Sequence, residues 1–151
     1  MYDALINAMQ ELLRETFEGG RTGEGTQYLD RTGGLIPTLS RLTAEQASVR
    51  PGTHPSIASH VRHMIFHLRV SHEWVMGDHS RRDWKGSFEP QAVTTGEWAQ
   101  LLEELESTRQ DFLRVMKALP PATFASEGAG MGSIAHLAYH LGAIRQHLPD
   151  A

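Results

Sequence analysis

Four long segments of the sequence place apolar residues three and four positions apart, the spacing of one face of an α-helix. They cover roughly residues 3–18, 56–75, 94–119 and 133–149. The β-branched, alternating runs that indicate strands do not occur. A helix with an apolar stripe is stable only when the stripe is covered, so four such segments predict an all-α, up-down-up-down four-helix bundle.

Capping and turn residues set the expected helix boundaries. Pro55 precedes the second helix and Gly77 follows it, with Ser56 as the N-cap. Ser133 is the expected N-cap of the last helix. Capping-box spacing begins at Thr43 and at Thr94, and the polar residues 77–93 indicate a long surface connection.

Composition limits the classes of function. The 151 residues fit one domain over positions 1–151, and the net charge of −4 disfavours binding to nucleic acid. The sequence has no cysteine, which excludes disulfides and thiolate ligands. No run is long and apolar enough for a membrane span, and the N-terminus lacks the pattern of a signal peptide, so we expect a cytoplasmic protein.

Histidines gather in two of the predicted helices. The second helix carries His60, His63 and His67 on its apolar side, and the last helix carries His136 and His140 one turn apart. A buried imidazole without a partner costs about 1–3 kcal/mol, so several facing one interior indicate a shared metal ion. If the two helices run parallel, either His60 or His63 lies at the depth of the pair, and spacing alone does not choose between them.

Three imidazole ligands leave a coordination position open, which is the arrangement of a catalytic zinc site, although nickel and copper also accept imidazole. The HLAYH motif lacks the glutamate of zinc proteases, so we exclude that activity. Arg145 is a candidate for the rim of a substrate pocket. The remaining histidines have no convergent partners in the sequence pattern and are expected to be surface or packing residues: His54, His72, His79 and His147.

Two rival interpretations stay open. In one, the bundle is a non-enzymatic binding or interaction protein with a structural metal site, and His60 or His67 closes the site as a fourth ligand. In the other, the histidines hold no metal.

The motifs SIASHVRHM, at residues 56–64, and HLAYHLGAIRQ, at residues 136–146, resemble those of the DinB/YfiT-like family of four-helix-bundle, metal-dependent proteins. The resemblance implies a metal triad of His63, His136 and His140, with His60 and His67 beside it. It also implies zinc or nickel as the metal, a homodimer, and relatives that include transferases and isomerases acting with a low-molecular-weight thiol. Since a bound metal lowers the pKa of a water or thiol, we expect a hydrolase or a thiol-dependent S-transferase.

Overall fold

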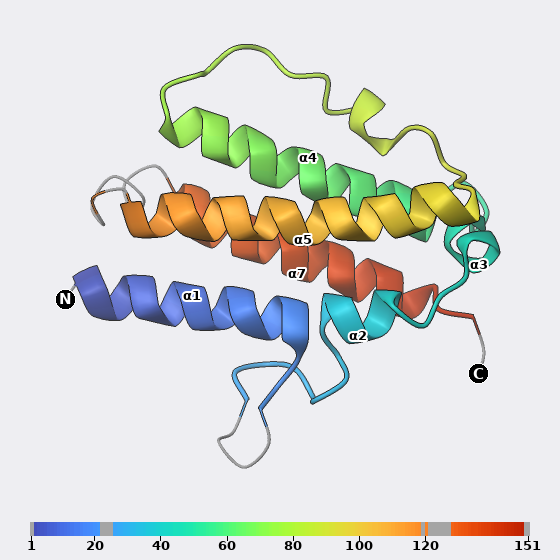
Figure 1. The fold of residues 1–151 in the computed structure, drawn as a ribbon, viewed down its shortest axis with the longest axis horizontal. Helices are drawn as coiled ribbons and strands as arrows, with labels where there is room; N and C mark the ends of the chain where they lie inside the picture. Colours follow the sequence, from blue (N-terminus) through green and yellow to red (C-terminus); the bar gives the residue numbers. More distant parts are fainter. Residues whose placement is uncertain (1, 22–25, 119, 121–127, 150–151) are drawn as a thin grey trace.

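The computed structural model describes residues 2–21, 26–118, 120 and 128–149, and every regular element in these ranges is a helix (Figure 1). This confirms the all-α class. The long helices are α1 (Tyr2–Glu18), α4 (Ile57–Val75), α5 (Thr95–Ala118) and α7 (Ala129–Gln146). Short helices α2 (Leu35–Leu39) and α3 (Ala44–Ser48) lie between α1 and α4, and a 3-10 turn, η1 (Gly86–Phe88), lies between α4 and α5. Among these helices, none is long and apolar enough to cross a membrane.

The order of helix directions differs from the predicted one. The chain leaves the end of α4, returns along the length of that helix, and begins α5 beside the first turn of α4, so α4 and α5 are parallel (Figure 1). Helix α7 is antiparallel to α4, because His60 contacts His140 while Ser71 contacts Ser133. The prediction of an up-down-up-down bundle is therefore wrong, and the order is up-down-down-up.

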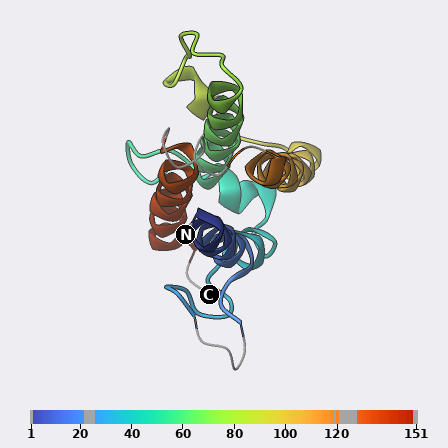
Figure 2. The ribbon, with the colours of Figure 1, turned by 90° about the vertical axis from the view of Figure 1, so that its left-hand side faces the viewer.

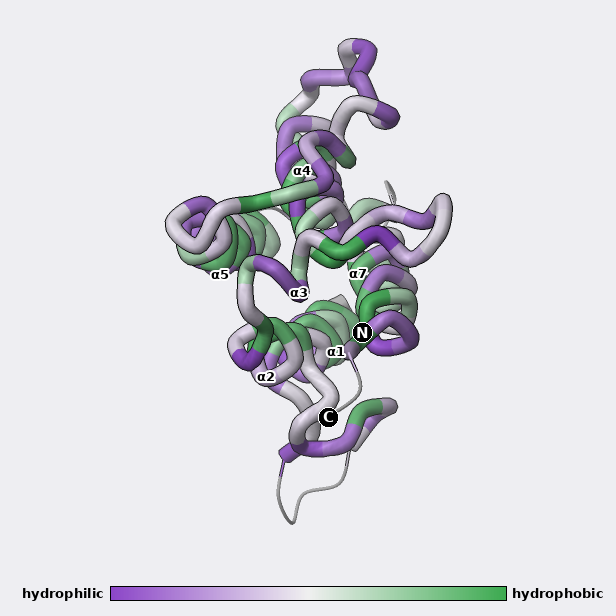
Figure 3. Tube along the Cα trace, turned by 90° about the vertical axis from the view of Figure 1, so that its right-hand side faces the viewer, coloured by the Kyte–Doolittle hydropathy of each residue, from purple (hydrophilic) through white to green (hydrophobic). Residues whose placement is uncertain are grey.

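The length of the connection explains this topology. Helix α4 has 19 residues and rises about 28 Å, at 1.5 Å per residue. Residues 76–94, which we call the crossover, span that distance easily at up to about 3.3 Å per extended residue. The crossover is rich in hydrophilic residues and projects from the bundle above α4 (Figure 3).

The caps at the entrance to α4 and α5 confirm the local sequence signals. Ser56 accepts a hydrogen bond from the backbone N–H of Ser59, and Thr43 forms the full capping box of α3. Thr94 and Glu97 form the second reciprocal pair. Ser133 is not a cap, because α7 begins one turn earlier at Ala129, after a left-handed Gly128.

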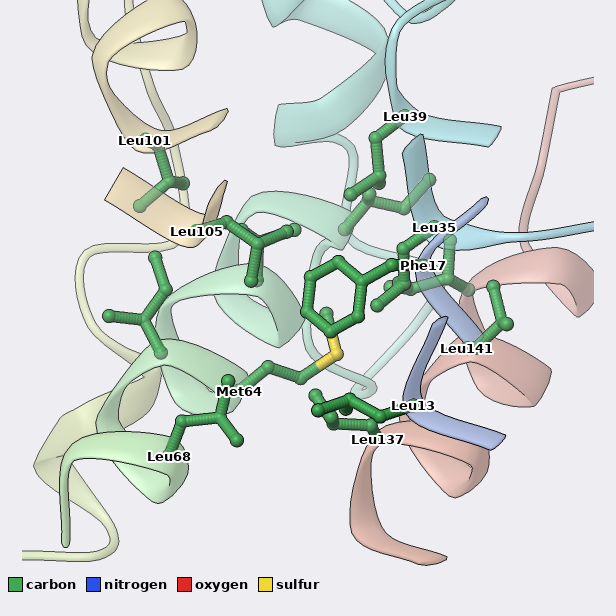
Figure 4. Close-up of a cluster of buried hydrophobic side chains, with 14 of the residues drawn as sticks. Leu13, Phe17, Leu35, Leu39, Met64, Leu68, Leu101, Leu105, Leu137 and Leu141 are labelled. Atoms are coloured by element: carbon green, nitrogen blue, oxygen red, sulfur yellow. The ribbon is translucent and has the colours of Figure 1, made fainter. Parts of the chain in front are cut away.

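The core fills the space enclosed by the four long helices, which Figure 2 shows end-on. Phe17, at the end of α1, is fully buried at its centre and lies among leucines from every side (Figure 4). The surrounding side chains include Leu13, Leu35, Leu39, Met64, Leu68, Leu101, Leu105, Leu137 and Leu141. Burial of this set holds α4 against α7 and so fixes the register in which their histidines meet.

A buried carboxylate anchors the segment that follows α1. Glu15 is 1% exposed and accepts the backbone N–H groups of Gln27 at 2.8 Å, Tyr28 at 2.7 Å and Leu29 at 2.6 Å. Burial alone would raise the pKa of Glu15, but these three donors outweigh it and hold the pKa below the usual 4.5. The carboxylate therefore stays ionised and satisfies three backbone donors at once.

Candidate metal centre

Five of the six histidines of α4 and α7 meet where the two helices face each other. His136 and His140 lie one turn apart and so share one face of α7. Because α4 is antiparallel to α7, His60 lies beside His140 and His63 lies beside His136. His60, His63 and His140 are all less than 8% exposed. The packing of the two helices thus gathers imidazoles separated by more than 70 positions in sequence.

Three ring nitrogens converge on one point. His136 Nε2 lies 3.0 Å from His63 Nε2 and 3.1 Å from His140 Nε2. His63, His136 and His140 each offer one nitrogen, and all three atoms lie within 4.8 Å of one another. Nitrogens bound tetrahedrally to one zinc ion at the usual bond length would lie about 3.3 Å apart. Small adjustments of the rings therefore suffice to place all three around a single ion.

Hydrogen bonds among the three rings cannot pair all of their protons and lone pairs. A neutral imidazole carries one N–H and one lone pair. If Nε2 of His136 carries the proton, it donates a good hydrogen bond to only one of its two neighbours, His63 and His140. If Nε2 carries the lone pair instead, the proton lies on the buried Nδ1, which has no hydrogen-bond partner in the structure. One Lewis acid accepting three lone pairs removes the conflict, so the donor set fits a transition metal.

Burial keeps the three rings neutral at pH 7, which is the form that binds metal. It lowers the pKa of His63 and of His136 to about 4 and that of His140 to about 3. Neighbouring imidazoles contribute to the lowered pKa of His63 and His140 after burial, because a second positive charge nearby is unfavourable. Their lone pairs are therefore available without loss of a proton.

A family model for the DinB superfamily matches residues 27–144, which includes α4, most of α7 and all three converging histidines. The chain belongs to the DinB superfamily. Searches of curated proteins and of solved structures found no match. The family assignment confirms the resemblance carried by the two histidine motifs. The candidate ligands themselves are identified from the geometry of the histidines.

In this DinB-superfamily protein, the other two histidines of the cluster occupy different positions from the converging set. His60 Nδ1 lies 2.8 Å from His140 Nδ1, on the side of the ring that faces away from His136. His67 stacks on His136 with ring centroids 3.7 Å apart, and neither of its buried nitrogens has a hydrogen-bond partner. Among the described residues, only the triad of His63, His136 and His140 forms a group with metal-ligand spacing.

The crossover supplies contacts that the sequence did not predict. Ser87 Oγ lies 2.6 Å from His63 Nδ1, and the ring of Phe88 stacks on His63 at 3.9 Å. Trp84 contacts Phe66 and His67, with ring centroids 5.2 Å and 5.8 Å apart, and so ties the crossover to the bundle. No spacing in the sequence relates Ser87 to His63, because the contact depends on the crossover folding back along α4.

Two further expectations concern residues outside the converging triad. His54 and His147 were expected to be surface or packing residues, and their rings stack on each other at 5.7 Å beyond the start of α4. Arg145 was expected at the rim of the site. Its guanidinium instead lies 3.5 Å from the Asp30 carboxylate, against the segment that follows α1.

Proposed function

We propose that this protein is a metal-dependent enzyme in which the Nε2 atoms of His63, His136 and His140 bind one divalent transition metal, zinc or nickel. The convergence of these three nitrogens carries the proposal, because their lone pairs and protons cannot all be paired with one another. Membership of the DinB superfamily supports it.

A divalent ion with three protein ligands retains open coordination positions and supplies Lewis acidity, which lowers the pKa of a water or thiol that binds there. The chain's own residues prepare that position. The three imidazoles are neutral, His63 and His140 are buried while His136 is half-buried, and Phe88 covers one face of His63. Among the described residues no fourth side chain completes the donor set, which favours a reactive site over a closed structural one.

The reaction we propose is hydrolysis or S-transfer with a low-molecular-weight thiol as co-substrate. Both need a nucleophile generated near neutral pH, which the Lewis acidity of such a site provides. The alternative is a non-enzymatic bundle with a structural metal or none. His60 and His67 are the side chains closest to serving as a fourth ligand. His60, however, contacts Nδ1 of His140 and not the converging Nε2 atom, and His67 is stacked on His136.

Metal analysis tests the ligand set. Protein purified without added metal, then incubated with zinc and freed of excess, is expected to hold one ion per chain. His140→Ala is expected to lose it, while His79→Ala is the matched control, because His79 stacks on Trp74 at 4.0 Å outside the cluster. Equal metal content in the wild type and His140→Ala would remove His140 from the site.

Spectroscopy tests the open position. In protein loaded with cobalt(II), cysteine is expected to add a thiolate charge-transfer band and change the visible spectrum. A spectrum unaffected by thiol, together with a large loss of thermal stability on chelation, would favour the structural alternative.

We also propose a homodimer, with the outward face of α7 as the surface that contacts the second copy. Met131 and Tyr139 are 60% and 72% exposed there, and Ala135 and Gly142 share this face. From Ala129 to Ile144 the helix carries no Lys, Arg, Asp or Glu, which is unusual for a solvent-facing helix. Light scattering of wild type and Tyr139→Lys measures the association, and a monomeric wild type would contradict it.

A further inference from the structure

The crossover brings one hydroxyl group to the back of the His63 ring. Ser87 lies in η1, and its Oγ is 2.6 Å from His63 Nδ1. The same oxygen lies 2.6 Å from the backbone carbonyl oxygen of Trp84. On the opposite side of the ring, His63 Nε2 faces His136 Nε2 at 3.0 Å. One ring nitrogen of His63 therefore contacts the crossover, and the other faces the point where the three histidines converge.

The protons in this chain of contacts have only one consistent arrangement. A carbonyl oxygen accepts and never donates, so the single hydroxyl proton of Ser87 goes to Trp84. Ser87 Oγ then presents lone pairs to His63 and accepts a hydrogen bond from Nδ1–H. A neutral imidazole with its proton on Nδ1 has a lone pair on Nε2, the atom that faces the other two histidines.

We infer that Ser87 is a positioning residue that fixes the Nδ1–H tautomer and the ring orientation of His63, so that Nε2 is presented as a metal ligand. The inference rests on the proposed metal site and assigns the crossover a part in it. Ligand histidines in proteins generally donate their second N–H to a fixed acceptor, and loss of that acceptor weakens metal binding. Here the acceptor comes from outside the two helices that carry the ligands.

The parallel arrangement of α4 and α5 makes this contact possible. If α4 and α5 were antiparallel, a short turn at the end of α4 would connect them. No segment would then return along α4 to contact His63. The long return path instead lies along α4 and is tied to it beside His63, where the Ser59 hydroxyl donates to the carbonyl oxygen of Phe88. Stacking of Phe88 on His63 adds a second restraint on the ring.

The tautomer is measured directly by two-dimensional ¹⁵N–¹H NMR of the histidine rings in metal-free protein at neutral pH. His63, assigned by its loss in His63→Gln, is expected to carry its proton on Nδ1. In Ser87→Ala it is expected to shift toward the Nε2–H form that free histidine prefers, and Ser87→Thr is expected to restore Nδ1–H. An Nε2–H proton on His63 in the wild type, or an unchanged tautomer in Ser87→Ala, would overturn the inference.

Zinc affinity provides the second readout, by competition with a chromophoric chelator. Ser87→Ala is expected to bind zinc roughly 10- to 100-fold more weakly, and Ser87→Thr close to the wild type. The matched control is Ser59→Ala, which removes a bond between α4 and η1 without touching a histidine. An equal loss in Ser59→Ala and Ser87→Ala would show that Ser87 only anchors the crossover, and this would overturn the inference.

The two proposals fail differently. If the wild type binds no zinc, the proposed metal site is wrong, and the tautomer of His63 still decides the role of Ser87. If the wild type binds zinc and Ser87→Ala binds it equally well, the metal site stands and the role of Ser87 is wrong.

Discussion

Replacing Glu15 with glutamine tests whether a single buried carboxylate holds the segment after α1. One oxygen, Oε1, accepts the N–H groups of Tyr28 and Leu29, and the other, Oε2, accepts that of Gln27. In Glu15→Gln the amide oxygen retains two of these bonds. The amide NH₂ group then faces the third N–H, so two donors oppose each other.

The expected loss follows from these contacts. A hydrogen bond to a charged group contributes about 1.5–3 kcal/mol, and one is lost outright. The other two become neutral and weaker, while burying an amide in place of a charge recovers part of the loss. We expect Glu15→Gln to lower the free energy of unfolding by about 2–4 kcal/mol. For a chain of this size, that corresponds to a fall in Tm of roughly 5–15 °C.

Urea unfolding monitored by circular dichroism measures the difference, with Glu11→Gln as the matched control on the same helix. Glu11 forms ion pairs with Arg14 and Arg21, at 2.8 and 3.3 Å, but its side chain is 38% exposed. Exposed pairs contribute about 0–1 kcal/mol, so the control is expected to change little. A loss of less than 1 kcal/mol in Glu15→Gln would refute the proposed anchoring role.

The pH dependence gives an independent check. Because the pKa of Glu15 is lower in the folded protein than in the unfolded chain, its contribution is full above the unfolded value near 4.5. It is lost as the pH falls through the folded pKa and the carboxylate takes up a proton. The stability difference between wild type and Glu15→Gln should therefore shrink below about pH 4.5. A difference that stays constant in acid would contradict the pKa assignment.

Three further predictions concern the metal, the core and the cap of α4. Zinc at 100 times its dissociation constant should raise the free energy of unfolding by about 2.7 kcal/mol in calorimetry, and excess chelator should reverse this; the same shift in His140→Ala would contradict the site. Phe17→Ala should lower the free energy of unfolding in urea by about 3–5 kcal/mol, because the ring is fully buried, and a loss below 1 kcal/mol would show that the core closes around the gap. Ser56→Ala should cost about 1 kcal/mol in thermal unfolding through loss of the α4 cap, whereas an unchanged Tm would mean that the cap contributes nothing.

The local signals in the sequence predicted the local structure well. Ser56 caps α4, which ends at Val75 as the spacing predicted, and the capping boxes at Thr43 and Thr94 both form. These features depend on residues three or four apart, whose contacts form within one helical turn. Ser133 was misread because the helix signal before it, in a stretch with three glycines, was weak, and α7 begins at Ala129.

The histidine site was predicted for a reason that proved wrong. The depth comparison assumed parallel helices and a cap at Ser133, yet the two helices are antiparallel and Ser133 lies inside α7. In the actual register Nδ1 of His60 contacts Nδ1 of His140, and Nε2 of His63 contacts Nε2 of His136. The family motif chose His63 over His60, which spacing alone left open, and the structure brings His63 into the converging triad.

The sequence by itself determined that the chain is helical, where α4 begins and ends, and that the imidazoles of α4 and α7 lie on apolar faces. Each of these properties follows from periodicity and capping within a few residues. Only the tertiary structure decided the direction of α5, the pairing of His63 with His136, the burial of Glu15 and the contact between Ser87 and His63. These depend on contacts between segments far apart in the chain, whose register is set by packing around Phe17 and by the path of the crossover.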